Sequence, residues 1–132
     1  MASIRRETLI HAAADELWSA LRDVGALHTR LVPGFVIECA WDGEGRDITF
    51  ANGMKARELI VDVDDATRRV AWTATGRLKH HNASAQVFPE GAGSCRVVWI
   101  ADLLPDEMAP AIAAMIEQGL AAMKRHAERP KG

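Results

Sequence analysis

His81 is the residue of this sequence best placed to do chemistry. It shares its parity with Ala83 and Ala85, and alternate residues of a strand point to the same side, so all three side chains should lie on one apolar face. An imidazole on such a face must find a hydrogen-bond partner or lose its charged form. We therefore expect His81 to be a general acid/base, a ligand anchor or a structural histidine with an internal partner.

Arg57 is the second candidate, because it lies where the alternation of apolar residues between positions 54 and 63 changes phase. A β-bulge near Arg57 and Glu58 would account for this change. If the bulge turns Arg57 inward, its guanidinium can hold a carboxylate or phenolate by two parallel hydrogen bonds. If the phase changes one residue earlier, Arg57 is a surface residue and Glu58 takes its place.

Metal and cofactor sites are not expected. The sequence has no Gly-rich phosphate loop, no nucleophile elbow and no zinc-ligand spacing. His80 and His81 are adjacent, so in a strand they point to opposite faces and cannot share one ion. Cys39 and Cys95 form no CxxC pair, and we interpret both as small buried hydrophobic residues.

The segment Pro110 to Ala127 carries the clearest helical pattern of the chain. Pro110 suits the first position of a helix, where its missing N–H costs nothing. Apolar residues then recur at intervals of three and four, and one face must be buried. They are Ile112, Met115, Ile116, Gly119, Leu120 and Met123. The methionines and the gap at Gly119 are typical of an adaptable binding surface, and ordinary core packing explains them equally well.

The rest of the chain predicts a first strand, two short helices and six further strands. The first strand covers Ser3 to Ile10, and the helices cover Ala12 to Asp23 and Ala26 to Leu31. From Phe35 to Asp102 six short alternating segments follow, separated by turn signals such as Asn52-Gly53. This order favours an antiparallel meander over a parallel α/β sheet.

The alternation also predicts which strand residues face the long helix. We expect the inward set to be Ile37, Trp41, Phe50, Leu59, Val61, Trp72, Ala83, Ala85, Val97 and Trp99. Its tryptophans offer flat apolar walls for a ligand, although burial in the core accounts for them as well.

Composition predicts one domain spanning residues 1–132. The chain has 132 residues, 48% hydrophobic and 26% charged, with a formal net charge of −2 and a pI of about 6.2. It lacks the basic excess of nucleic-acid-binding proteins, and no apolar run is long enough to span a membrane. Arg5, Arg6 and Glu7 lie where a signal peptide would be apolar, so a cytoplasmic location is expected.

Four stretches of the chain follow a known family pattern: Ile10 to Trp18, Val87-Phe88-Pro89, Val97-Val98-Trp99, and Gly119-Leu120 with Lys124. In these stretches the chain resembles the START-like, or SRPBCC, superfamily of polyketide cyclase/dehydrase and lipid-transport proteins. Asn52 to Glu58 and His80 to Ser84 resemble an uncharacterised bacterial subgroup of it. Ala13 departs from the family, which often has proline there. The resemblance implies an α+β helix-grip fold, with a curved seven-stranded antiparallel sheet wrapped around the C-terminal helix. It also implies an apolar cavity between them, entered near the two short helices.

Three functions follow from these patterns. The first is binding or transport of a small hydrophobic or aromatic molecule between the sheet and the C-terminal helix. The second is a cyclase- or dehydratase-like enzyme, in which His81 moves a proton and Arg57 stabilises enolate charge. The third is a protein-partner module, of which a homodimer is the mildest form. The predicted ligand-binding residues are Trp41, Phe50, Arg57, Leu59, Trp72, His81, Trp99, Met115, Gly119 and Met123.

Overall fold

The computed structural model describes residues 1–130 and confirms the predicted seven-stranded antiparallel sheet with its long C-terminal helix. The sheet order is β1-β7-β6-β5-β4-β3-β2, so the six strands after the short helices form a continuous meander and β1 closes beside β7. The elements are β1 (Ala2–Ile10), α1 (Ala14–Arg22), the π-helical turn η1 (Leu27–Leu31), β2 (Val36–Trp41), β3 (Gly45–Phe50), β4 (Lys55–Asp64), β5 (Arg69–Thr75), β6 (His80–Pro89), β7 (Cys95–Leu104), the 3₁₀ turn η2 (Asp106–Met108) and α2 (Ala109–Ala127).

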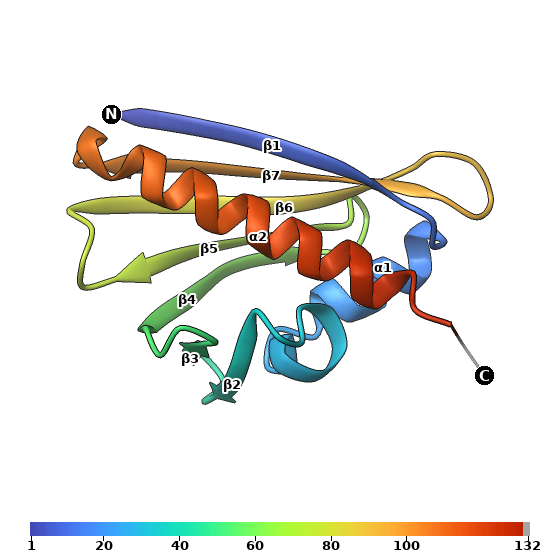
Figure 1. The fold of residues 1–132 in the computed structure, drawn as a ribbon, viewed down its shortest axis with the longest axis horizontal. Coiled ribbons are helices and arrows are strands. Elements are labelled where there is room, and N and C mark those ends of the chain that lie inside the picture. Colours follow the sequence, from blue (N-terminus) through green and yellow to red (C-terminus); the bar gives the residue numbers. More distant parts are fainter. Residues whose placement is uncertain (131–132) are drawn as a thin grey trace.

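Helix α2 runs obliquely across one face of the sheet, and its C-terminal end comes close to α1 (Figure 1). Ile116, Leu120 and Met123 of α2 are buried on the sheet side, which is the apolar stripe that the sequence predicts. Gly119 lies at the closest approach, because a Cβ atom there would come within 2.8 Å of the Trp99 ring. The helix therefore packs on the sheet through a glycine that leaves room for an indole.

The change of phase in β4 comes later than the sequence suggests. The register between β4 and β5 shifts between Ile60 and Asp62, not at Arg57 and Glu58. The even-numbered positions of β4 up to Ile60 therefore face the helix, and Leu59 and Val61 do not. Val61 is 59% exposed, so its predicted inward position is wrong.

Strand β2 differs from the prediction in the same way. Its register shifts between Val36 and Glu38, so Val36 is buried and Ile37 is 51% exposed. Trp41 contacts the protein mainly through the atoms near its backbone, since a Cβ on Gly25 would lie 2.8 Å from the Trp41 Cβ. The Trp41 residue as a whole is 42% exposed. Ile37 and Trp41 are therefore not part of the inward wall.

Side-chain contacts hold the short helices and the end of α2 in place. The Trp18 indole N–H donates to Asp65 Oδ1 at 2.9 Å, and Arg22 binds the same oxygen at 2.8 Å, which ties α1 to the β4–β5 turn. Lys124 donates to the Leu9 carbonyl at 2.8 Å, which ties α2 to β1. These contacts close one end of the space between helix and sheet.

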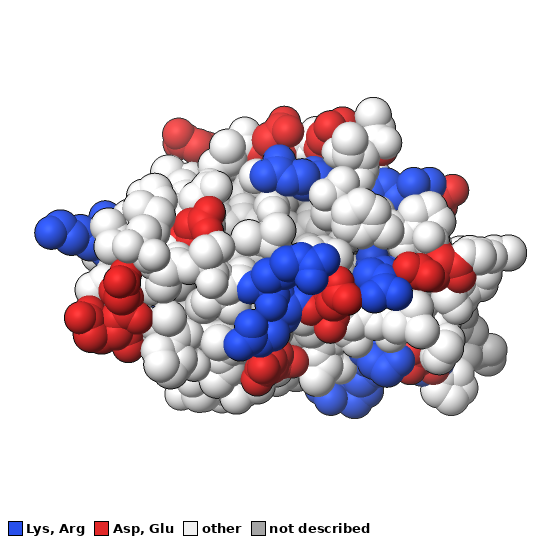
Figure 2. Space-filling model, turned by 90° about the horizontal axis from the view of Figure 1, so that it is seen from above, with Lys and Arg blue, Asp and Glu red and all other residues white. Residues whose placement is uncertain are grey.

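Charges of both signs are interspersed over the face seen from above, without a continuous patch of one sign (Figure 2). Within residues 1–130 no helix has the length and apolar character needed to cross a bilayer.

Candidate functional site

A cavity of about 470 Å³ lies between the concave face of the sheet and α2. This volume falls within the range of about 300–1,000 Å³ that is ordinary for small-molecule sites. Most of its lining residues are apolar, and they come from α1, η1, the strands and α2. The buried apolar lining residues are Leu21, Leu27, Leu31, Val32, Val36, Ile48, Phe50, Val70, Trp72, Ala85, Ala101, Ile116 and Met123.

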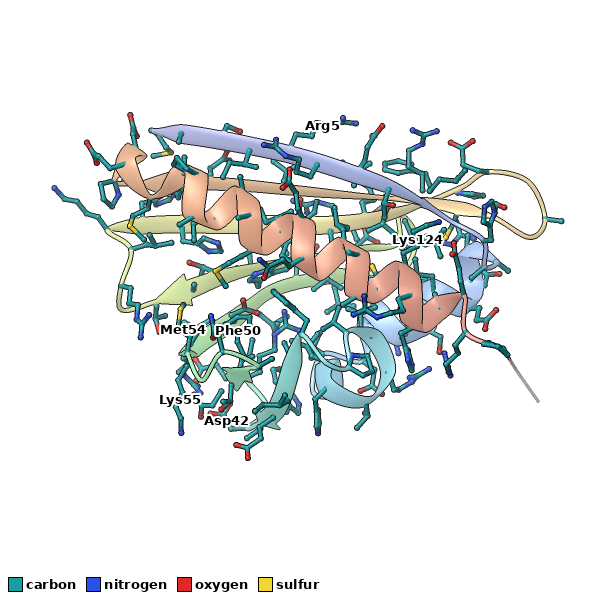
Figure 3. All side chains as sticks on the ribbon, in the orientation of Figure 1. Arg5, Asp42, Phe50, Met54, Lys55 and Lys124 are labelled. Atoms are coloured by element: carbon teal, nitrogen blue, oxygen red, sulfur yellow. The ribbon has the colours of Figure 1, made fainter. Side chains whose placement is uncertain are left out.

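The mouth of the cavity lies at the end of the sheet away from α1. The exposed lining residues belong to the β3–β4 hairpin, the β5–β6 loop, η2 and the N-terminal half of α2: Asn52, Lys55, Thr75, Arg77, Met108, Ala111, Ala114 and Gln118. Figure 3 shows Met54 and Lys55 at this hairpin, far from Lys124 at the other end of α2. The expected entrance near the two short helices is therefore wrong, since their lining residues Leu21, Leu27 and Leu31 are buried.

Aromatic rings line the cavity in two edge-to-face pairs. The centroids of Trp72 and Trp99 lie 5.7 Å apart, and those of Phe35 and Phe50 lie 5.3 Å apart. Aromatic pairs prefer this edge-to-face geometry. The cavity therefore has flat aromatic walls suited to an apolar or aromatic molecule.

A buried ion pair forms one polar side of the cavity. Arg46 binds Glu58 Oε1 through Nε at 2.8 Å and through Nη2 at 2.7 Å, and the two side chains are only 5% and 14% exposed. The remaining Nη1 donates to the Val24 carbonyl at 3.2 Å, and the guanidinium lies 5.5 Å from the centre of the Trp72 ring. Oε1 takes both guanidinium contacts, which leaves Glu58 Oε2 for another donor.

His81 lies on the same side of the cavity, two strands further on. Glu58 is paired with Ala74 in the sheet, and the Ala74 backbone N–H donates to His81 Nδ1 at 2.9 Å. Arg46 is paired with Glu58 in turn, so Arg46, Glu58, Ala74 and His81 form a row across β3 to β6. The Thr73 hydroxyl also donates to the His81 carbonyl, which fixes this part of β6.

The hydrogen bond at Nδ1 defines what His81 can do. A nitrogen that accepts an N–H bond carries no proton, so the neutral ring has its proton on Nε2. Burial lowers the pKa of His81 below its usual value, an effect that His80 reinforces and Glu58 opposes. At neutral pH His81 is therefore an uncharged hydrogen-bond donor through Nε2–H.

The structure brings together six of the predicted ligand-binding residues and separates the other four. Phe50, Trp72, His81, Trp99, Met115 and Met123 line the cavity. Gly119 packs against Trp99 and Phe35, with ring atoms 2.8 Å and 3.2 Å from where its Cβ would be, and leaves no open surface to a ligand. Trp41 and Leu59 do not line the cavity, for the register reasons given above.

Arg57 lies outside the cavity as well. It binds Asp42 at 2.8 Å and Asp47 at 3.2 Å on the other face of the sheet. Its hydrogen bond to Asp42, with that to Asp47, raises the Arg57 pKa above its usual value. The pKa of Asp42 falls to about 2, mainly because the Gly45 and Glu44 backbone N–H groups donate to it. Arg57 therefore stabilises a surface network, and its predicted place beside a ligand is wrong.

Arg46 and Glu58 are the cavity residues that the sequence prediction missed or left as an alternative. Arg46 shares its parity with the inward residues Ile48 and Phe50, and Glu58 shares that of Met54 and Ala56. For both residues, the alternation of the strand therefore indicated a side chain that points toward the helix. In residues 1–130 no group of three or more His, Cys, Asp or Glu side chains is arranged to hold a metal ion.

Solved structures with the same fold include proteins of several kinds. An uncharacterised protein from Bacillus thuringiensis superposes with a TM-score of 0.87 at 14% identity, covering 97% of this chain and 100% of that one. The di-domain ARO/CYC BexL from the BE-7585A biosynthetic pathway gives 0.81 at 21% identity, covering 97% of this chain and 47% of that one. Norcoclaurine synthase from Thalictrum flavum superposes with a TM-score of 0.77 at 21% identity, covering 98% of this chain and 95% of that one.

Comparison with curated proteins gives no match. The family model described as polyketide cyclase/dehydrase and lipid transport matches residues 1–128. The helix-grip architecture and this match across almost the whole sequence agree, and the chain belongs to the polyketide cyclase/dehydrase and lipid transport family.

Proposed function

We propose that this protein binds a small apolar or aromatic molecule that carries an uncharged oxygen group. The observation that supports it is the cavity of about 470 Å³, whose apolar wall is interrupted by one row of polar side chains. Mostly apolar walls with a few convergent polar groups are the usual form of a small-molecule site.

The polar row defines the ligand group that it recognises. His81 offers an Nε2–H donor, and Glu58 offers Oε2 as an acceptor. Arg46 already neutralises Glu58, so the row as a whole carries no net charge. A hydroxyl or a carbonyl next to a hydroxyl satisfies both groups, whereas a buried carboxylate would meet Glu58 without a free cation.

The catalytic alternative has less support in this geometry. His81 cannot take a proton at Nε2, which already holds one, and Nδ1 is occupied by the Ala74 N–H. Arg57, the proposed enolate stabiliser, lies on the other face of the sheet. Binding requires only groups that are present, and the ARO/CYC protein and the synthase among the structural neighbours show only that the fold is shared.

A cavity-filling variant tests the proposal. Ala74 lines the cavity between Glu58 and His81, so Ala74→Leu should place its side chain where the ligand's oxygen group lies. The probe is N-phenyl-1-naphthylamine, a neutral aromatic amine that fluoresces in apolar surroundings. We expect the wild type to bind it and Ala74→Leu to bind it at least about tenfold more weakly, a loss of about 1.4 kcal/mol.

Ala92→Leu is the matched control, because Ala92 is exposed in the β6–β7 loop and the same atoms are added there. Its probe affinity should equal that of the wild type. Equal binding by Ala74→Leu and Ala92→Leu would show that the probe does not use the cavity, and would reject the proposed function. Native mass spectrometry of the protein purified from its own host would identify the natural ligand by its mass.

A further inference from the structure

Two basic side chains, Lys55 and Arg77, stand at the mouth of the cavity. Both are exposed and both line it, Lys55 from the start of β4 and Arg77 from the loop after β5. The register that pairs Arg57 with Thr75 places Lys55 and Arg77 at matching positions just beyond the end of that strand pair. Both residues stand on the rim there, since they border the cavity and also a hollow on the outer face that Arg57 and Asp47 line. Figure 3 shows Lys55 at the hairpin end of the sheet, next to Met54.

Neither cation has an acidic partner within residues 1–130. No ion pair or hydrogen bond in that part of the chain involves the Lys55 or Arg77 side chain, whereas Arg46 and Arg57 are both held by carboxylates. The one carboxylate in the cavity lining is Glu58, which Arg46 neutralises. Among the charged residues that line the cavity, Lys55 and Arg77 are therefore the two without a bound opposite charge in residues 1–130.

We propose that the ligand is an anionic amphiphile: its apolar body, with the uncharged oxygen group, fills the cavity, and a separate acidic group stays at the mouth between Lys55 and Arg77. This inference rests on the proposed function and adds the ligand's charge and orientation. The acidic group does not lie at the inner end of the cavity, because the inner polar row has no free cation and removing an anion from water is costly. At the exposed mouth the anion keeps its water and gains two cations.

Carboxylic acids and phosphate monoesters share this chemistry. The test therefore measures how decanoate, decyl phosphate and decanol each displace N-phenyl-1-naphthylamine, below the concentrations at which they aggregate. The variants are Lys55→Gln and Arg77→Gln. The matched control is Arg69→Gln, which removes the same charge from the opposite end of β5, outside the cavity lining.

We expect each mouth variant to weaken displacement by the anions about threefold, the size of an exposed charge pair, and to change displacement by decanol much less. Salt at about 0.5 M should shrink the difference for the anions by screening it. Arg69→Gln should match the wild type with all three competitors. The anion whose displacement falls more in the mouth variants is the closer match to the natural acidic group.

Two results contradict the inference, and they are distinguishable. If the mouth variants affect decanol as much as the anions, or affect neither, the mouth cations do not hold an acidic group and the inference alone fails. If N-phenyl-1-naphthylamine does not bind the wild type, the proposed function fails and this inference fails with it.

Discussion

At the scale of single residues, the acid–base state of His81 is set by its burial and by the N–H bond that it accepts. Because burial lowers its pKa in the folded state, the unfolded chain binds a proton more readily as the pH falls below about 6.5. The free energy of unfolding should therefore decrease as pH falls from about 6.5 toward the lower folded pKa, and be fully retained above that range.

Urea unfolding of the wild type and His81→Gln between about pH 5 and pH 7.5 measures this dependence. The difference between the two proteins isolates His81, because His126, whose pKa is also lowered mainly by burial, is present in both. The variant should have the shallower pH dependence. Parallel curves would show that His81 titrates alike in the folded and unfolded chains, and would remove the basis for an uncharged donor in the cavity.

The Arg46–Glu58 pair gives a second residue-level prediction. Removing one partner leaves a buried charge uncompensated, so Glu58→Met and Arg46→Met should each lower the free energy of unfolding by about 3 kcal/mol. The double variant leaves no unpaired charge, and it should cost at least about 1 kcal/mol less than the two single changes together. Chemical denaturation gives these values, and strictly additive losses would mean that the two side chains do not interact.

Residue parity predicted part of the site, and register decided the rest. Phe50, Trp72, His81 and Trp99 reach the cavity as predicted, because the pairings β3–β4, β5–β6 and β6–β7 have no register shift. Arg46 has the same parity as Phe50, but a charged side chain is not predicted to point inward unless a partner for its charge is known. That partner, Glu58, is fixed by the β3–β4 register, which the sequence does not specify.

At the scale of elements, the position of the β4 bulge explains the largest error. Leu59, Ile60 and Val61 are three consecutive apolar residues, so alternation fits either phase across them. The structure shifts the register between Ile60 and Asp62, and this one difference moves Arg57 to the outer face and Glu58 into the cavity. The C-terminal helix was predicted to within one residue of its start, because its three-and-four spacing is long and unbroken.

The contact between α2 and β7 gives a prediction at this scale. In Gly119→Ala the new methyl group would approach Trp99 Cζ3 to 2.8 Å, so the indole must move toward the cavity. A gain of about 1 kcal/mol in helix propensity offsets part of the strain, and stability should stay within about 1 kcal/mol of the wild type. Affinity for N-phenyl-1-naphthylamine should fall severalfold.

Ala121→Gly serves as the control for helix propensity alone, because Ala121 is exposed on α2. It should lower the free energy of unfolding by about 1 kcal/mol and leave probe affinity unchanged. Unchanged probe affinity in Gly119→Ala as well would mean that Trp99 does not form part of the ligand's wall.

At the scale of the whole molecule, the fold sets where a ligand enters and how it lies. α1 and the C-terminal end of α2 lie at one end of the sheet, and the β3–β4 hairpin and the β5–β6 loop lie at the other (Figure 1). The exposed residues of the cavity lining belong to the second end. The resemblance to the START-like superfamily implies this space, whereas the apolar faces of sheet and helix alone could pack together without it. The entrance was expected near the two short helices, and its actual place depends on how far the sheet curves around α2.

The four tryptophans provide the most direct test of whether this space is the binding site. Trp72 and Trp99 line the cavity. Trp18 lies in α1, where its indole N–H donates to Asp65, and Trp41 lies on the edge strand β2. Two-dimensional ¹H–¹⁵N NMR resolves their indole N–H signals, and single Trp→Phe variants assign them. On addition of N-phenyl-1-naphthylamine, the Trp72 and Trp99 signals should shift while those of Trp18 and Trp41 stay in place; shifts confined to Trp18 or Trp41 would contradict a ligand site between α2 and the sheet.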